Sequence, residues 1–124
     1  MKAIKLPEWV YDSLARQAVE SFGGCSGDLK NGGEDGLHDA HVFDLEEDYE
    51  LAGRDIYVRV SGEIGVDIID QSFSHEFGTE YRTGYELTGL EQLDKVELSD
   101  GDTGKAVKSD FDERLFAQKV NALC

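Results

Sequence analysis

The sequence is poor in the residues that build disulfide-bonded and membrane proteins. Its 124 residues include two cysteines and one proline, and no apolar run approaches the roughly 18 residues that a membrane helix needs. Two cysteines without metal-ligand spacing are more typical of free thiols than of a disulfide framework. The N-terminal segment lacks the apolar core of a signal peptide. We therefore expect a cytoplasmic protein that makes no contact with a membrane.

Positive charge is also scarce, and the shortage is confined to one part of the chain. The sequence has 27 acidic and 12 basic residues, for a net charge of −15. Residues 28–102 hold 21 of the acidic residues and 5 of the basic ones, whereas the flanking segments are close to neutral. Such a segment repels the phosphates of nucleic acid. The charge therefore argues against direct nucleic-acid binding and favours a protein partner with a basic surface.

An amphipathic helix is predicted near each end of the chain. In residues 6–24, apolar side chains recur every four positions, with Pro7 suited to the first turn and Gly23 to the residue after the last. In residues 109–123, Ser109 or Asp110 is the expected N-cap. The two apolar stripes are Val10, Leu14, Ala18 and Phe22 beside Trp9, and Leu115, Phe116, Val120 and Leu123. Residues 23–40 are rich in glycine, and we expect a flexible loop there.

The middle of the chain alternates between apolar and polar residues, which is typical of strands with one buried face. In residues 54–70 the apolar set is Ile56, Val58, Val60, Ile64, Val66 and Ile68. Gly62 falls on the same face, where a missing side chain suggests a bulge, a bend or close packing by a helix. Further strands are expected near 41–51, 81–89 and 90–99. The prediction is a single α+β domain over 1–124, an approximately four-stranded antiparallel meander with both terminal helices on one face.

The opposite face of this sheet is predicted to be acidic. Its outward positions include Asp55, Glu63, Asp67, Glu80, Glu86, Glu91 and Glu97, and Glu46, Glu47, Asp48 and Glu50 add charge at one end. Carboxylates held on such a grid can imitate a row of phosphates to a protein that binds nucleic acid. Arg59, Arg82 and Lys95 interrupt the face and are expected to neutralise part of it through cross-strand pairs.

Three patterns suggest chemistry but lack the context that chemistry needs. GGCSGDL followed by His38 and His41 resembles the nucleophile region of NlpC/P60-type cysteine peptidases, yet Cys25 follows a helix instead of opening one. Metal binding would need the loops that carry His38, His41, His75 and Glu76 to converge, and no spacing requires this. The turn DGDTG fails as a calcium loop because Lys105 and Phe111 occupy its sixth and twelfth positions. We expect no catalytic residue, metal or cofactor.

The runs VRVSGEIGVDI and TGYELTGLEQLDKVELSDGDTG are similar to segments of small accessory proteins encoded by phages and other mobile elements. The resemblance implies a setting in which acidic proteins inhibit host defence, including anti-CRISPR and anti-restriction proteins, and it assigns no catalytic residue. The leading hypothesis is a non-enzymatic acidic protein that engages the basic surface of a nucleic-acid-handling host protein. The alternatives are an assembly accessory protein of a phage or mobile element and, less favoured, a cysteine- or metal-dependent enzyme.

Overall fold

The structure is a computed structural model that describes residues 5–33, 37–70, 73–80, 83–108 and 110–124. Its elements are α1 (Glu8–Glu20), a short 3-10 helix η1 (Ser26–Asp28), β1 (His38–Leu51), β2 (Arg54–Asp70), β3 (Phe73–His75), β4 (Gly78–Glu80), β5 (Thr83–Asp100) and α2 (Glu113–Leu123). Two helices and antiparallel strands make this an α+β protein, as the sequence predicts. No helix within the described ranges is both long and apolar enough to cross a membrane.

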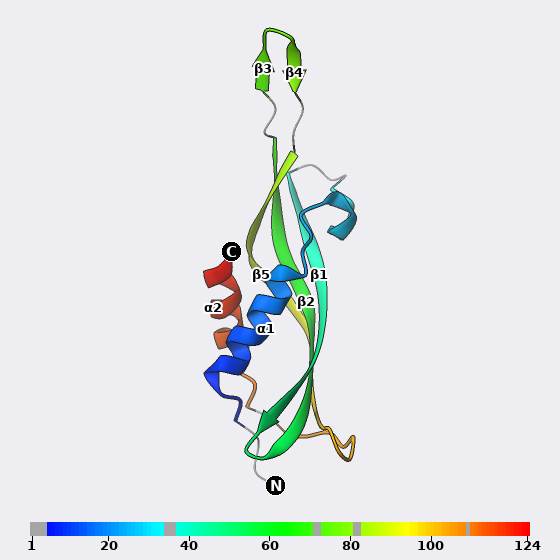
Figure 1. The fold of residues 1–124 in the computed structure, drawn as a ribbon, viewed down its shortest axis with the longest axis vertical. Helices are drawn as coiled ribbons and strands as arrows, with labels where there is room; N and C mark the ends of the chain where they lie inside the picture. Colours follow the sequence, from blue (N-terminus) through cyan, green and yellow to red (C-terminus); the bar gives the residue numbers. More distant parts are fainter. Residues whose placement is uncertain (1–4, 34–36, 71–72, 81–82, 109) are drawn as a thin grey trace.

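The main sheet has three antiparallel strands in the order β1-β2-β5, with β2 in the centre. The short strands β3 and β4 pair with each other in a separate hairpin, which projects beyond the end of the sheet (Figure 1). This arrangement differs from the expected four-stranded meander. The segments 83–89 and 90–99, expected as two strands, belong to the single strand β5.

Three register shifts explain why β5 resembles two strands in the sequence. They lie opposite the steps Ser61/Gly62, Glu63/Ile64 and Gly65/Val66 of β2. At each shift one extra residue of β5 (Asp94, Glu91 and Thr88) has no partner on β2, as in a β-bulge. The apolar residues of β5 therefore recur at intervals of three where the bulges fall: Leu87, Leu90, Leu93 and Val96. Gly89, at the expected boundary between the strands 81–89 and 90–99, instead lies inside β5 opposite Gly65.

The apolar face of β2 forms the centre of the core. Ile56, Val58, Val60, Ile64 and Val66 are fully buried, in agreement with the predicted alternation. Gly62 lies at a register shift, and a side chain there would collide with the backbone oxygen of Gln92 and the ring of Phe43. Of the alternatives expected at Gly62, the bulge is confirmed, with its extra residue on β5, while the close packing comes from neighbouring strands and not from a helix.

Both helices contribute side chains to the same core cluster as the strands. On β1, the Phe43 ring lies 6.2 Å from the ring of Phe116 of α2. The ring of Tyr49 contacts Trp9 of α1 edge-on at 5.6 Å, and its hydroxyl donates to Ser13. Aromatic side chains thus join the two helices to one face of the sheet.

The helix ends differ in detail from the sequence prediction. The N-cap of α2 is Asp112, whose carboxylate accepts a 3.0 Å hydrogen bond from the Leu115 N–H. Asp110 lies before the helix, and Ser109 falls outside the described residues. After α1, the positive φ of 78° belongs to Gly24 instead of Gly23. Asp112 caps better than Asp110 because the apolar stripe of α2 begins at Leu115, one turn after it.

The glycine-rich loop is shorter than predicted, because β1 begins at His38 instead of after residue 40. The buried carboxylate of Asp39 accepts hydrogen bonds from the backbone N–H groups of Asn31 (3.1 Å) and Gly33 (2.8 Å). Burial tends to raise the pKa of Asp39, but these bonds and one from the Ala40 N–H outweigh it and lower that pKa. The loop is thus fastened to the beginning of β1.

Candidate functional site

The outer face is defined here as the side of the main sheet turned away from the core. On β2 it carries Asp55, Tyr57, Arg59, Ser61, Glu63 and Asp67, which alternate with the buried residues. The register places acidic residues of the neighbouring strands beside them. Glu50 lies opposite Asp55 and Glu46 opposite Arg59 on β1, while Glu97 lies opposite Arg59 and Glu86 opposite Asp67 on β5.

Most of the predicted acidic residues come together on this face, and two do not. Glu47 pairs with the buried residue Val58, so it belongs to the core side of β1 and is only half-exposed. Glu80 belongs to β4, in the separate hairpin, and its side chain lies outside the described part of the structure. Arg82 also falls outside the described residues. Counting alternate positions from Asp44 would have excluded Glu47 and added Asp44 itself.

Arg59 neutralises part of the face near the middle of β2. Its guanidinium binds both carboxylate oxygens of Asp44, at 2.9 and 3.2 Å, and Glu46 lies 3.7 Å away. The hydrogen bonds from Arg59 lower the pKa of Asp44. On β5, Lys95 makes a 3.2 Å ion pair with Glu97. Arg59 therefore forms the cross-strand pair expected of it, whereas Lys95 pairs with a residue of its own strand, so that Asp44 and Glu97 do not present bare charge.

Glu63 is on the outer face by alternation but is only 8% exposed. The ammonium of Lys30 lies 2.8 Å from its carboxylate, and hydrogen bonding to this carboxylate raises the pKa of Lys30. Lys30 reaches this position because its backbone N–H donates to the Ala40 carbonyl at 2.7 Å, which holds the loop along β1. The carboxylate of Glu63 therefore stabilises the fold through its ion pair with Lys30 and does not present a free charge on the outer face. No local sequence pattern predicts the Lys30–Glu63 pair, because the loop that carries Lys30 has no periodicity.

His38 bridges two carboxylates farther along the face. Its Nδ1 lies 2.7 Å from Asp67, and its Nε2 hydrogen-bonds to Glu91. These bonds raise the pKa of His38, first through Asp67 and then through Glu91. Glu91 is one of the extra residues of β5, and it lies over Gly65, where a side chain would collide with it. The bulge therefore creates the pocket of negative charge that His38 occupies.

The histidines and Cys25 do not form a common centre. His38 and His41 are strand residues on opposite faces of β1, not the loop residues that the sequence suggests, and His75 lies in the projecting hairpin. Buried His41 contacts the Ser21 hydroxyl at 2.8 Å and the Asp28 carbonyl at 2.9 Å. Cys25 is exposed, with its sulfur 3.6 Å from the Asp28 carboxylate. Among the described residues, no group of three or more potential ligands could hold a metal ion.

The acidic residues of the outer face that have no ion-pair partner among the described residues lie mainly at the β1–β2 turn. Asp48, Glu50 and Asp55 are exposed and have no ion-pair partner among the described residues, and Glu86 on β5 is in the same state. Glu50 and Asp55 face each other directly across the two strands. Comparisons with protein-family models, curated proteins and solved structures found no match to this chain.

Proposed function

We propose that the protein is a non-enzymatic binding protein whose outer face docks on the basic surface of a nucleic-acid-handling protein. The observation that supports this most is the like-charged pair Glu50–Asp55 at the β1–β2 turn, with Asp48 beside it. Like charges directly opposite each other destabilise a sheet. A cationic partner removes this repulsion, so binding and the relief of repulsion reinforce each other.

The geometry of these carboxylates favours nucleic-acid mimicry as the mode of binding. Alternate residues on a strand are about 6.6–6.8 Å apart, and neighbouring strands lie about 4.8 Å apart. Asp48 and Glu50 are alternate residues of β1, and Asp55 lies across from them on β2. Their charges are therefore held by backbone hydrogen bonds at fixed spacings, which lowers the entropy lost on binding. We expect no direct binding to nucleic acid, because these carboxylates repel its phosphates.

The resemblance to accessory proteins of phages and mobile elements gives the proposal a context. In that context the partner is a host defence protein with a basic nucleic-acid groove. This protein would then be an inhibitor of the anti-CRISPR or anti-restriction type. It would act in the cytoplasm, where such targets are found. The ion pairs of Arg59, Lys95 and Lys30 reduce the charge at the centre of the face. We therefore place the binding surface at the turn end.

The test is capture of the partner on immobilised protein, followed by competition with double-stranded DNA. The parent is compared with the double variant Glu50→Lys, Asp55→Lys. Its matched control is Glu20→Lys, Asp110→Lys, which changes net charge equally at exposed positions that do not belong to the turn. The proposal predicts that DNA displaces the partner and that only the turn variant loses it. A partner that resists excess DNA, or that binds both variants equally, contradicts the proposal.

A second candidate function is that of an assembly protein. The observation that favours it is the presence of exposed aromatic side chains at both ends of the elongated molecule, Phe77 in the β3–β4 hairpin and Trp9 near the β1–β2 turn. Assembly contacts of this kind depend on apolar burial and tolerate salt, whereas docking of the acidic turn weakens as ionic strength rises.

A further inference from the structure

The β3–β4 hairpin carries an aromatic side chain that nothing in the described structure covers. Phe77 is 87% exposed, at the tip of a hairpin that projects from one end of the long axis (Figure 1). Its backbone N–H donates to His75 Nδ1 at 3.2 Å, and the two rings meet edge-on at 6.2 Å. The tip therefore presents the Phe77 ring together with the neighbouring carboxylate of Glu76, which has no ion-pair partner among the described residues.

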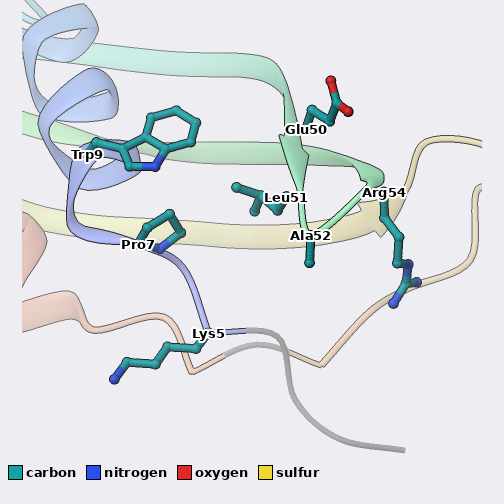
Figure 2. A pocket seen from close by; sticks show the side chains of 7 residues that line it. All are labelled: Lys5, Pro7, Trp9, Glu50, Leu51, Ala52 and Arg54. Atoms are coloured by element: carbon teal, nitrogen blue, oxygen red, sulfur yellow. The ribbon is translucent and has the colours of Figure 1, made fainter.

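The other end of the molecule has a hollow whose lining is largely apolar and could receive an aromatic side chain. It has a volume of about 470 Å³ and lies between the start of α1 and the β1–β2 turn. Figure 2 shows Trp9 and Pro7 on one side and Leu51 and Ala52 on the other. Trp9 is 52% exposed, although the sequence pattern placed it beside the buried stripe of α1. The hollow therefore offers an aromatic and aliphatic lining, in which Trp9 and Ala52 are exposed while Leu51 belongs to the core.

The margin of this hollow carries charges of both signs, because Glu50 lines it together with two basic residues. Lys5 and Arg54 lie at its edge (Figure 2). Arg54 makes a 2.8 Å ion pair with Asp100, whereas Lys5 has no ion-pair partner in the described part of the chain. An apolar group that arrives with a carboxylate beside it fits both the lining and the margin. Phe77 and Glu76 are such a pair.

The backbone of the turn gives independent support for a role of the hollow. Ala52 has a φ of 51° and Gly53 a φ of 77°, as in a type I′ turn. Asparagine or glycine is strongly preferred at the first of these positions, and alanine is strained there. Ala52 forms part of the wall of the hollow. A short apolar side chain is thus kept at a strained position that faces the space to be filled.

We propose that the tip of the β3–β4 hairpin of one molecule inserts Phe77 into the Trp9 hollow of a second copy, with Glu76 beside Lys5. The two surfaces lie at opposite ends of the long axis, so one molecule cannot satisfy both within itself. The contact is heterologous, and it produces linear head-to-tail chains of copies unless the geometry closes them into rings. This inference deepens the assembly candidate, and its hollow adjoins the acidic turn, since Glu50 lines the hollow whereas Asp55 does not.

The expected association is weak, because a single hairpin tip buries far less than the roughly 1,200 Å² of a stable interface. Dissociation constants between about 1 μM and 1 mM are typical of such contacts. The net charge of −15 also makes copies repel each other. Measurements therefore belong at about 0.15 M salt, where charges more than about 8 Å apart are largely screened.

The test is sedimentation of the full chain over this concentration range. The parent is expected to increase in average mass in steps of the 13.7 kDa chain, without stopping at a dimer. Phe77→Asp and Trp9→Ala are each expected to be monomeric. Their equimolar mixture retains one working contact, the Phe77 tip of one variant in the Trp9 hollow of the other, and should form a 1:1 pair. Leu37→Asp, at another exposed apolar residue, is the matched control and should associate like the parent.

A charge-exchange pair keeps the test decisive if Trp9→Ala disturbs α1. Glu76→Lys and Lys5→Glu should each weaken association alone, and mixing them should restore it. A parent that stays monomeric at 1 mM overturns the inference, as does association that survives Phe77→Asp. Mixtures that fail to associate also overturn it, because they exclude a head-to-tail contact. Phe77→Asp leaves the acidic turn unchanged and should still capture the partner of that turn, so the two proposals fail separately.

Discussion

The ammonium of Lys30 lies 2.8 Å from the carboxylate of Glu63, and this contact fastens the glycine-rich loop to the centre of the sheet. Glu63 is 8% exposed, so most of its hydration has been replaced by the ion pair. Removing one partner of a buried pair leaves the other charge uncompensated, which is far more destabilising than losing a surface pair.

We predict that Glu63→Lys lowers the free energy of unfolding by roughly 1–3 kcal/mol, because a second ammonium group would be placed at the buried position beside the half-exposed Lys30. Glu86→Lys, at an exposed position of the same face, should stay within about 0.5 kcal/mol of the parent. Urea denaturation measures both. Equal stability of the two variants would mean that Glu63 is an ordinary surface residue.

The bridge made by His38 predicts a pH dependence of stability. The pKa of His38 is raised above its usual 6.5 by Asp67 and Glu91. A raised folded-state pKa gives a stabilisation that is fully present below about pH 6.5 and is lost as pH rises through the higher folded value.

The measurement is the free energy of unfolding between pH 5.5 and pH 9 for the parent and for His38→Gln. The parent should lose stability relative to the variant as pH rises above about 6.5. Contributions of His41 and His75 are common to both proteins and cancel in the difference. Parallel curves would show that His38 does not bind a proton more tightly in the folded state.

The strained turn predicts a stabilising substitution. Ala52→Asn should raise the free energy of unfolding by roughly 0.5–1 kcal/mol, because asparagine tolerates a positive φ and favours the type I′ turn. The control Ala106→Asn changes an exposed alanine that lacks a positive φ and should have little effect. Thermal unfolding compares the two variants. A destabilised Ala52→Asn variant would show that the alanine is not strained.

The sequence predicted strand β2 well and strand β5 poorly, for one physical reason. Unbroken alternation assigns every residue of β2 to a face. In β5 the extra residues Thr88, Glu91 and Asp94 interrupt that alternation, and the interruption near Gly89 resembled a turn. The interval of three between Leu87, Leu90 and Leu93 was the available signal, since repeated bulges keep apolar side chains on one face.

The acidic face was predictable in location but not in charge state. Alternation identifies which carboxylates point outward, and it is correct for Asp55 and Asp67. It cannot identify the partners of Glu63 and Asp67. Lys30 reaches Glu63 from a loop, and His38 reaches Asp67 because β1 pairs with a segment of β2 that is distant in sequence. The carboxylates near the β1–β2 turn that have no ion-pair partner can be identified only once the pairs made by Lys30 and His38 are known.

The most direct test of the proposed function is the association rate of the partner recovered by capture, measured against salt concentration. Long-range attraction to the acidic turn should make the parent's rate fall steeply as salt increases. For Glu50→Lys, Asp55→Lys, the rate should be much lower and its salt dependence flatter, while Glu20→Lys, Asp110→Lys should follow the parent closely. Identical rates and salt slopes for the two double variants would contradict the account, because charge at the turn would then have no role in recognition.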